Sequence, residues 1–106
     1  MSFNGNEGTF ISLNDGATLT ANYRSGKYEP VLGYFFGAAK LQDLLDQSGC
    51  VGIRIYYGED SGTGAPELVL VGVDSDENDI LGTEPLVLDQ GSPCPPNCGN
   101  SNDLNS

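Results

Sequence analysis

Two apolar stretches decide the fold of this chain: residues 50–57, CVGIRIYY, and residues 67–73, ELVLVGV. β-Branched and aromatic residues dominate both stretches, which is typical of β-strands. The sequence between them, GEDSGTGAP at 58–66, is rich in residues that form turns. We therefore predict two antiparallel strands joined by a loop. The second stretch has apolar residues on both of its faces, which predicts a central strand.

Shorter segments complete the predicted fold. Residues 13–25 follow an N-capping Ser12 and carry a helical spacing that stops at Gly26. A second helix is predicted over 38–47, where leucines recur on one face before Gly49. Proline and glycine interrupt the aromatic residues 28–36, which favours an extended connector or short edge strand. With a third strand at 86–88, the predicted class is α+β: two short N-terminal helices packed on a small antiparallel sheet, a three-stranded meander.

The length of 106 residues predicts one domain. Its apolar residues are concentrated between 10 and 90, which we take as a single α+β domain. Residues 1–9 form a polar leader, and residues 91–106 form a tail rich in Cys, Pro, Gly and Asn. We expect both ends to be mobile unless a partner or a crosslink holds them.

The chain carries a net charge of −11, from fifteen acidic residues against only four Lys and Arg. So few cations argue against binding to nucleic acid or to an anionic membrane surface. Acidity instead suits solubility, a basic partner or cation binding. No apolar run reaches the ~20 residues of a membrane span. The N-terminus lacks the features of a signal peptide, so we expect a cytoplasmic protein, with signal-independent export left open.

Five segments of the sequence, taken in order, are TANYR (20–24), YFFG (34–37), CVGIRIYYG (50–58), LVLVGVD (68–74) and PCPPNC (93–98). Together they resemble a family of small bacterial proteins of uncharacterised function. The resemblance covers roughly residues 10–98. No activity, cofactor or catalytic residue is known for that family, so the resemblance implies no site.

The three cysteines, Cys50, Cys94 and Cys98, allow three interpretations. Cys94 and Cys98 enclose three residues, two of them prolines, which differs from the two-residue spacing of thioredoxin-type motifs. A structural clasp would pin the tail, either as a Cys94–Cys98 disulfide or through Cys50. A metal site could use all three thiolates, but the chain has no His and would need a further ligand. The pair could also be redox-active.

Residues 74–79, DSDEND, begin like a calcium-binding loop. The pattern then fails, because Asp79 stands where glycine is needed and Pro85 stands where a closing glutamate is needed. We predict a polar turn between strands. The alternative is a weak, partly hydrated cation site.

Arg54 is a charge in the middle of an apolar strand. A buried guanidinium needs a carboxylate or water, and the candidate partners are Asp15, Glu67 and the acids near Asp74. We expect a structural ion pair. The alternative is a ligand-binding site that includes Arg54 and Tyr56.

The sequence provides no catalytic set, since it contains no His to act as a general base at neutral pH. We therefore assign no catalytic residue and expect no cofactor. The favoured hypothesis is a non-enzymatic structural or protein-interaction module, which self-associates or binds a protein partner through a sheet edge or the aromatic cluster at 34–36. The alternatives are a cysteine-based metal or redox protein, and a small-ligand binder or enzyme with its site near Arg54.

Overall fold

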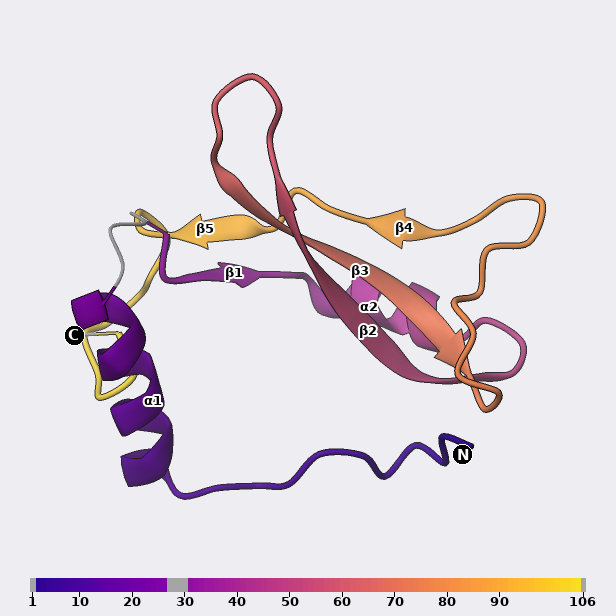
Figure 1. Ribbon diagram of the computed structural model, residues 1–106, viewed down its shortest axis with the longest axis horizontal. Helices are drawn as coiled ribbons and strands as arrows, with labels where there is room; N and C mark the ends of the chain where they lie inside the picture. The colour runs from indigo at the N-terminus through magenta and orange to yellow at the C-terminus, as the bar shows by residue number, and fades with distance from the viewer. Residues whose placement is uncertain (1, 27–30, 106) are drawn as a thin grey trace. The chain divides into compact units, whose positions relative to one another are not determined.

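The computed structural model describes residues 2–26 and 31–105, and within them it confirms the α+β class. Two antiparallel sheets are present, one in the order β2-β3-β4 and the other pairing β1 with β5 (Figure 1). The elements in chain order are α1 (Leu13–Gly26), β1 (Gly33–Phe35), α2 (Ala38–Leu45), β2 (Cys50–Glu59), β3 (Pro66–Asp74), β4 (Val87–Leu88) and β5 (Ser92–Cys94).

The chain forms two compact units whose segments alternate along the sequence. The first unit comprises residues up to Glu7 together with Phe36–Gly91. The second comprises Gly8–Phe35 and the residues from Ser92 onward. This division differs from the predicted single domain at 10–90, because pairing of β1 with β5 joins the tail to an N-terminal segment. Such a pairing has no signal in local sequence patterns.

The hairpin of β2 and β3 is the frame of the first unit. Residues Arg54 and Val71 face each other in its register, and a bulge between Cys50 and Gly52 shifts the pairing at one end. β3 is the central strand, as predicted, with β4 on its other side. Both strands run further than predicted, so the loop is only 60–65. The Asp60 carboxylate accepts hydrogen bonds from the loop, and the Thr63 backbone N–H lowers the pKa of that carboxyl.

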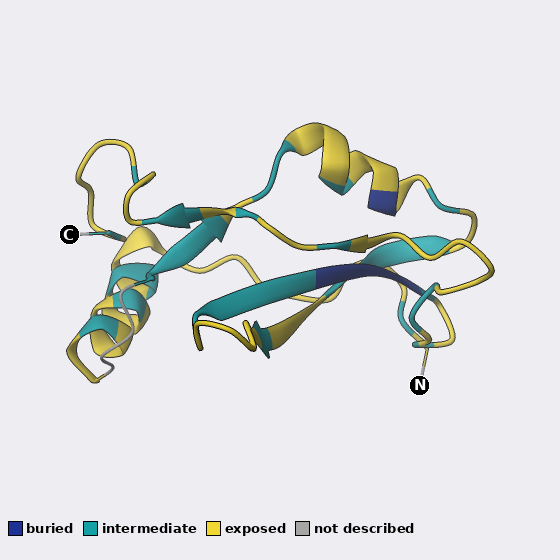
Figure 2. Cartoon of the chain, turned by 90° about the horizontal axis from the view of Figure 1, so that it is seen from above, coloured by how far each residue is buried: buried dark blue, intermediate teal, exposed yellow. Residues whose placement is uncertain are grey.

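The core of the first unit is built around β3, and its buried residues appear in Figure 2 as a dark band on β3 and a dark patch at the end of α2. Val71 and Val73 lie on the face of β3 that carries Arg54, while Leu70 lies on the opposite face, where α2 packs closely. Gly72 allows this close packing, because a Cβ there would lie 3.2 Å from the Leu44 carbonyl oxygen and 3.0 Å from the Cys50 sulfur. The buried apolar residues are Leu44, Leu70, Val71 and Val73.

The second unit consists of α1, the short pair β1 and β5, and the tail. The Ser12 hydroxyl accepts a hydrogen bond from the Asp15 backbone N–H, which confirms the predicted N-cap of α1. Arg24 in the last turn donates to the Leu104 carbonyl oxygen at 2.7 Å and so links the helix to the tail. The predicted connector at 28–36 contains β1 at its end, while Tyr28 and Pro30 lie outside the described residues.

Helix α1 thus belongs to the second unit, whereas the sequence analysis grouped both helices with the three-stranded sheet. The reason lies in its composition. None of its described side chains is buried, and its two leucines, Leu13 and Leu19, are 58% and 62% exposed. A helix without a continuous apolar stripe has little to gain from covering a sheet.

The N-terminal leader makes contacts with the rest of the first unit. Residues 2–7 belong to the first unit, where the Phe3 backbone N–H donates to the Ser75 carbonyl oxygen at 2.9 Å. The Glu7 carboxylate accepts hydrogen bonds from the backbone N–H groups of Asn4 and Gly5. Phe3 fixes the segment because its ring packs against the Arg54 guanidinium, 5.8 Å from the ring centre.

Candidate functional site

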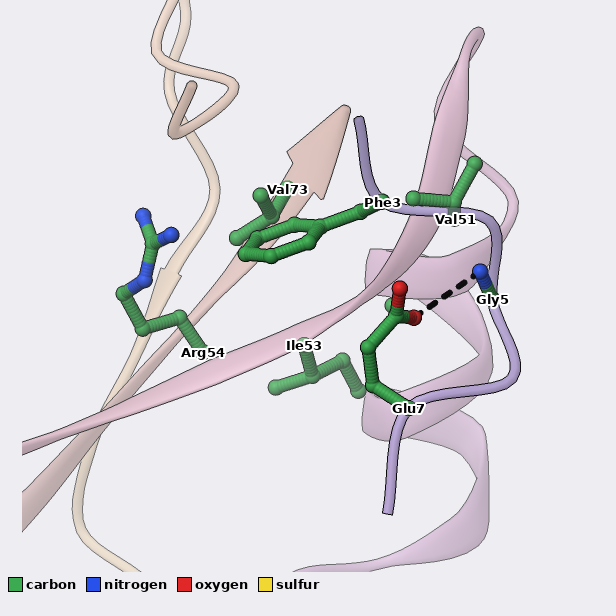
Figure 3. Close-up of a pocket in the computed structure, with 8 residues that line it drawn as sticks. Phe3, Gly5, Glu7, Val51, Ile53, Arg54 and Val73 are labelled. Atoms are coloured by element: carbon green, nitrogen blue, oxygen red, sulfur yellow. Dashed lines mark hydrogen bonds between the residues drawn. The ribbon is translucent and has the colours of Figure 1, made fainter. Parts of the chain in front are cut away.

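Strand β2 leaves one of its edges without a partner strand. It stands at the end of the order β2-β3-β4, so within the described ranges only β3 pairs with it. The leader lies along the first part of this edge, as Figure 3 shows, and a Cβ on Gly5 would come within 3.3 Å of the Val51 carbonyl oxygen. The part that follows, residues 54–59, is the section of the edge that the leader leaves open. We refer to it as the open edge.

Three large side chains of the open edge, Ile55, Tyr56 and Tyr57, are exposed to solvent. Ile55 and Tyr57 alternate with Tyr56, so both point to the same face of the sheet. Ile55 pairs with Leu70 across the hairpin, and Leu70 lies on the same face of β3 as Gly72. The face that carries Ile55 and Tyr57 is therefore the one on which α2 packs. Helix α2 covers only the beginning of the strand, and Ile55 and Tyr57 remain 53% and 93% exposed. The open edge therefore combines free backbone groups with uncovered apolar surface.

The opposite face of β2 carries a polar cluster centred on Arg54. Its guanidinium forms an ion pair with Asp79 at 2.5 Å and also donates to the Glu77 carbonyl oxygen at 3.3 Å. The Tyr56 hydroxyl donates to the second carboxylate oxygen of Asp79. The hydrogen bond to Asp79 raises the pKa of Arg54. This arrangement agrees with the expected structural ion pair, and the partner comes from the acidic segment near Asp74.

A groove of about 300 Å³ lies between the leader and the bulged end of β2 (Figure 3). Apolar side chains form most of its wall, while the charged groups are Glu7 and Arg54. Of the two residues proposed for a ligand site, Arg54 lines this groove and Tyr56 does not. The lining residues are Phe3, Gly5, Glu7, Val51, Gly52, Ile53, Arg54 and Val73.

The cysteines are divided between a disulfide and a thiol. Cys94 and Cys98 are joined in a disulfide that closes a short loop in the second unit. Cys50 belongs to the first unit, where its thiol donates to the Gly52 carbonyl oxygen at 3.2 Å. Disulfide sulfurs are not thiolate ligands, so the proposed three-cysteine metal site would require reduction. Across 2–26 and 31–105, no three Cys, Asp or Glu side chains gather in a way that could hold a metal ion.

The acidic segment at 74–79 forms the predicted polar turn. The Asp74 carboxylate accepts hydrogen bonds from the backbone N–H groups of Asp76 and Asn78. Glu77 adopts a positive φ of 71°. The turn brings Asp79 back beside the strand, where an isolated bridge pairs it with Val73. Its role is therefore to position the carboxylate that binds Arg54.

The aromatic cluster at 34–36 does not form one exposed patch. Phe35 is 67% exposed, but Tyr34 and Phe36 are half-buried. The open edge is therefore the better candidate of the two interaction surfaces that the sequence suggested. The alternation of Ile55 and Tyr57 predicts a buried strand face, and it is the short length of α2 that leaves these two side chains uncovered.

Comparison with models of protein families, with curated proteins and with solved structures gave no match. The resemblance to a family of small bacterial proteins therefore stays a prediction. No helix in the described part of the chain is long and apolar enough to cross a membrane.

Proposed function

We propose that this chain is a non-enzymatic protein-interaction module that binds an extended segment of another polypeptide at the open edge of β2. The observation that carries the proposal is the coincidence of an unpaired strand edge with two exposed apolar side chains, Ile55 and Tyr57. In strand addition, backbone hydrogen bonds provide affinity, and pockets for alternate side chains provide specificity. Natural proteins usually cover or block a long edge strand, and here only its beginning is covered.

The charge of the chain favours a cationic partner segment. Acidic side chains stand at the loop end of the hairpin, at Glu59, Asp60 and Glu67, and the chain as a whole carries −11. A segment with alternating apolar and basic residues would place its apolar side chains beside Ile55 and Tyr57. Its basic side chains would then reduce the electrostatic repulsion and accelerate association.

A titration of the ¹⁵N-labelled chain with the peptide KVKVKVK tests the proposal. We expect amide shift changes centred on residues 54–59. A control peptide with proline at its central position should not bind, because proline removes a backbone donor. Changes confined to other residues, or equal binding of both peptides, would contradict strand addition at this edge.

Two matched variants of the chain sharpen this test. Ile55→Thr should weaken peptide binding about tenfold, since burial of an isoleucine contributes roughly 1.5 kcal/mol. Leu81→Thr removes a side chain of nearly equal exposure, 50% against 53%, from a loop outside the edge. We expect this control to bind the peptide like the unmodified chain.

A second candidate function is the binding of a small aromatic acid in the groove near Arg54. The observation that favours it is the apolar wall with a guanidinium at one side, although the volume lies at the lower limit for ligand pockets. Benzoate and benzyl alcohol provide a charged and neutral pair of probes. Benzoate-specific shift changes at Val51, Ile53 and Arg54 would support this function, and equal or absent responses to both probes would refute it.

A further inference from the structure

We infer that the segment bound at the open edge is the same edge of a second copy of this chain, paired antiparallel about a two-fold axis at Tyr56. The inference rests on the proposed function and adds the register and the identity of the partner, which is the chain's own edge in place of a cationic segment. Such an interface is isologous, since the same residues contribute from both copies. It would join two three-stranded sheets into one of six strands.

Symmetry limits the registers that can form. A two-fold axis perpendicular to the sheet leaves the same face of both copies on the same side of the joined sheet. Two residues that lie directly opposite each other must therefore have residue numbers that are both odd or both even. The open edge spans 54–59, which leaves axes at residues 55, 56 and 57 as the central choices. An axis at 55 would bring Glu59 of one copy against Val51 of the other, where the leader already lies. An axis at 57 would place Ile55 opposite the Glu59 carboxylate.

The axis at Tyr56 makes the exposed apolar surfaces complementary. It places Ile55 of each copy opposite Tyr57 of the other, and these are the two exposed apolar side chains of the edge on the face where α2 packs. Pairs of an aromatic and a β-branched residue are among the favourable cross-strand pairs. Helix α2 would lie on the same face of the sheet in both copies and flank this apolar patch from each side. In this register the strand of the second copy does not displace the leader from the beginning of β2.

Electrostatic repulsion opposes this dimer. Arg54 of each copy would face Gly58 of the other, and its guanidinium stays paired with Asp79 of its own copy. The total charge of −11 per copy opposes association. We expect the dimer to strengthen with added salt as the overall repulsion is screened.

Cysteine crosslinking tests both the partner and the register. In a Cys50→Ser background, Tyr56→Cys places two thiols opposite each other, at a Cα separation of roughly 5 Å that suits a disulfide. The control Gly58→Cys lies on the same face, but its two thiols would be about 13 Å apart along the strands. Mild oxidation should give a covalent dimer with Tyr56→Cys and a monomer with Gly58→Cys. Preferential crosslinking by Tyr57→Cys or Gly58→Cys would overturn this register.

Sedimentation of the unmodified chain separates failure of this inference from failure of the proposed function. We expect reversible dimers that are stronger at 0.5 M than at 0.05 M NaCl, and a loss of affinity of at least tenfold with Tyr57→Ser. A strict monomer at both salt concentrations overturns the inference. If that monomer still binds KVKVKVK at residues 54–59, the edge is an interaction site for a different chain. If it binds no peptide, the proposed function fails as well.

Discussion

Replacement of Gly72 by alanine should destabilise the first unit, because this glycine sets the distance between α2 and the sheet. A Cβ at this position would lie 2.6 Å from the Gln47 side-chain nitrogen, 3.0 Å from the Cys50 sulfur and 3.2 Å from the Leu44 carbonyl oxygen. The Gln47 amide can move, but it would lose its 3.0 Å hydrogen bond to that same carbonyl. The backbone oxygen moves only if the end of the helix moves.

The magnitude follows from two opposing terms. Extra volume in a well-packed core costs about 1–3 kcal/mol. Loss of backbone freedom in the unfolded chain returns about 0.4–1 kcal/mol when alanine replaces glycine. We therefore expect Gly72→Ala to lower the free energy of unfolding by about 1–2 kcal/mol. For a domain of this size, each kcal/mol lowers the melting midpoint by roughly 4–8 °C.

Gly52 provides the matched control, because it lies on the neighbouring strand and a Cβ there meets nothing within 4 Å. Gly52→Ala should be neutral or stabilising by about 0.4–1 kcal/mol. Urea unfolding, followed through the amide signals of β2 and β3, measures both variants. If Gly72→Ala proves as stable as Gly52→Ala, then α2 does not approach the sheet as closely as described. If Gly72→Ala is destabilised, adding Gln47→Ala should restore part of the loss.

Three further predictions concern the leader, the polar cluster and the disulfide. Hydrogen bonds led by the one from the Asn4 backbone lower the pKa of Glu7 below its ordinary value of 4.5. This carboxylate therefore stabilises the leader above about pH 4.5 and ceases to do so as pH falls through the lowered pKa. We expect the protection of the leader amides, taken relative to the intrinsic exchange rate at each pH, to fall over this range, and Glu7→Gln to lower it at pH 7. Protection that does not change with pH would refute this. Tyr56→Phe removes one partly exposed hydrogen bond to Asp79 and should cost about 1 kcal/mol or less in urea unfolding. A loss above about 2 kcal/mol would mean that this hydrogen bond is buried rather than partly exposed. Reduction of the Cys94–Cys98 disulfide should accelerate amide exchange in the second unit and leave the first unit unchanged, because the fully buried apolar residues among 2–26 and 31–105 lie in the first unit. An equal effect on both units would contradict this.

Local patterns in the sequence determined the secondary structure of the central region. Alternation of side chains at 50–57 and 67–73 predicts the hairpin, and apolar residues on both faces of the second stretch predict its central place. Capping by Ser12 and the leucine spacing at 38–47 predict the two helices. These features depend on residues that are close in sequence, so the sequence alone is sufficient to read them.

The choice of partners across the chain was decided only by the tertiary structure. Arg54 needs a carboxylate, but fifteen acids were available, and the turn at 74–79 selects Asp79 by bringing it back beside β2. Phe3 attaches a polar leader that its composition predicted to be mobile. The open edge itself depends on where a short helix ends over a longer strand. Each of these outcomes is a contact between distant residues, and its free energy depends on a geometry that local periodicity does not encode.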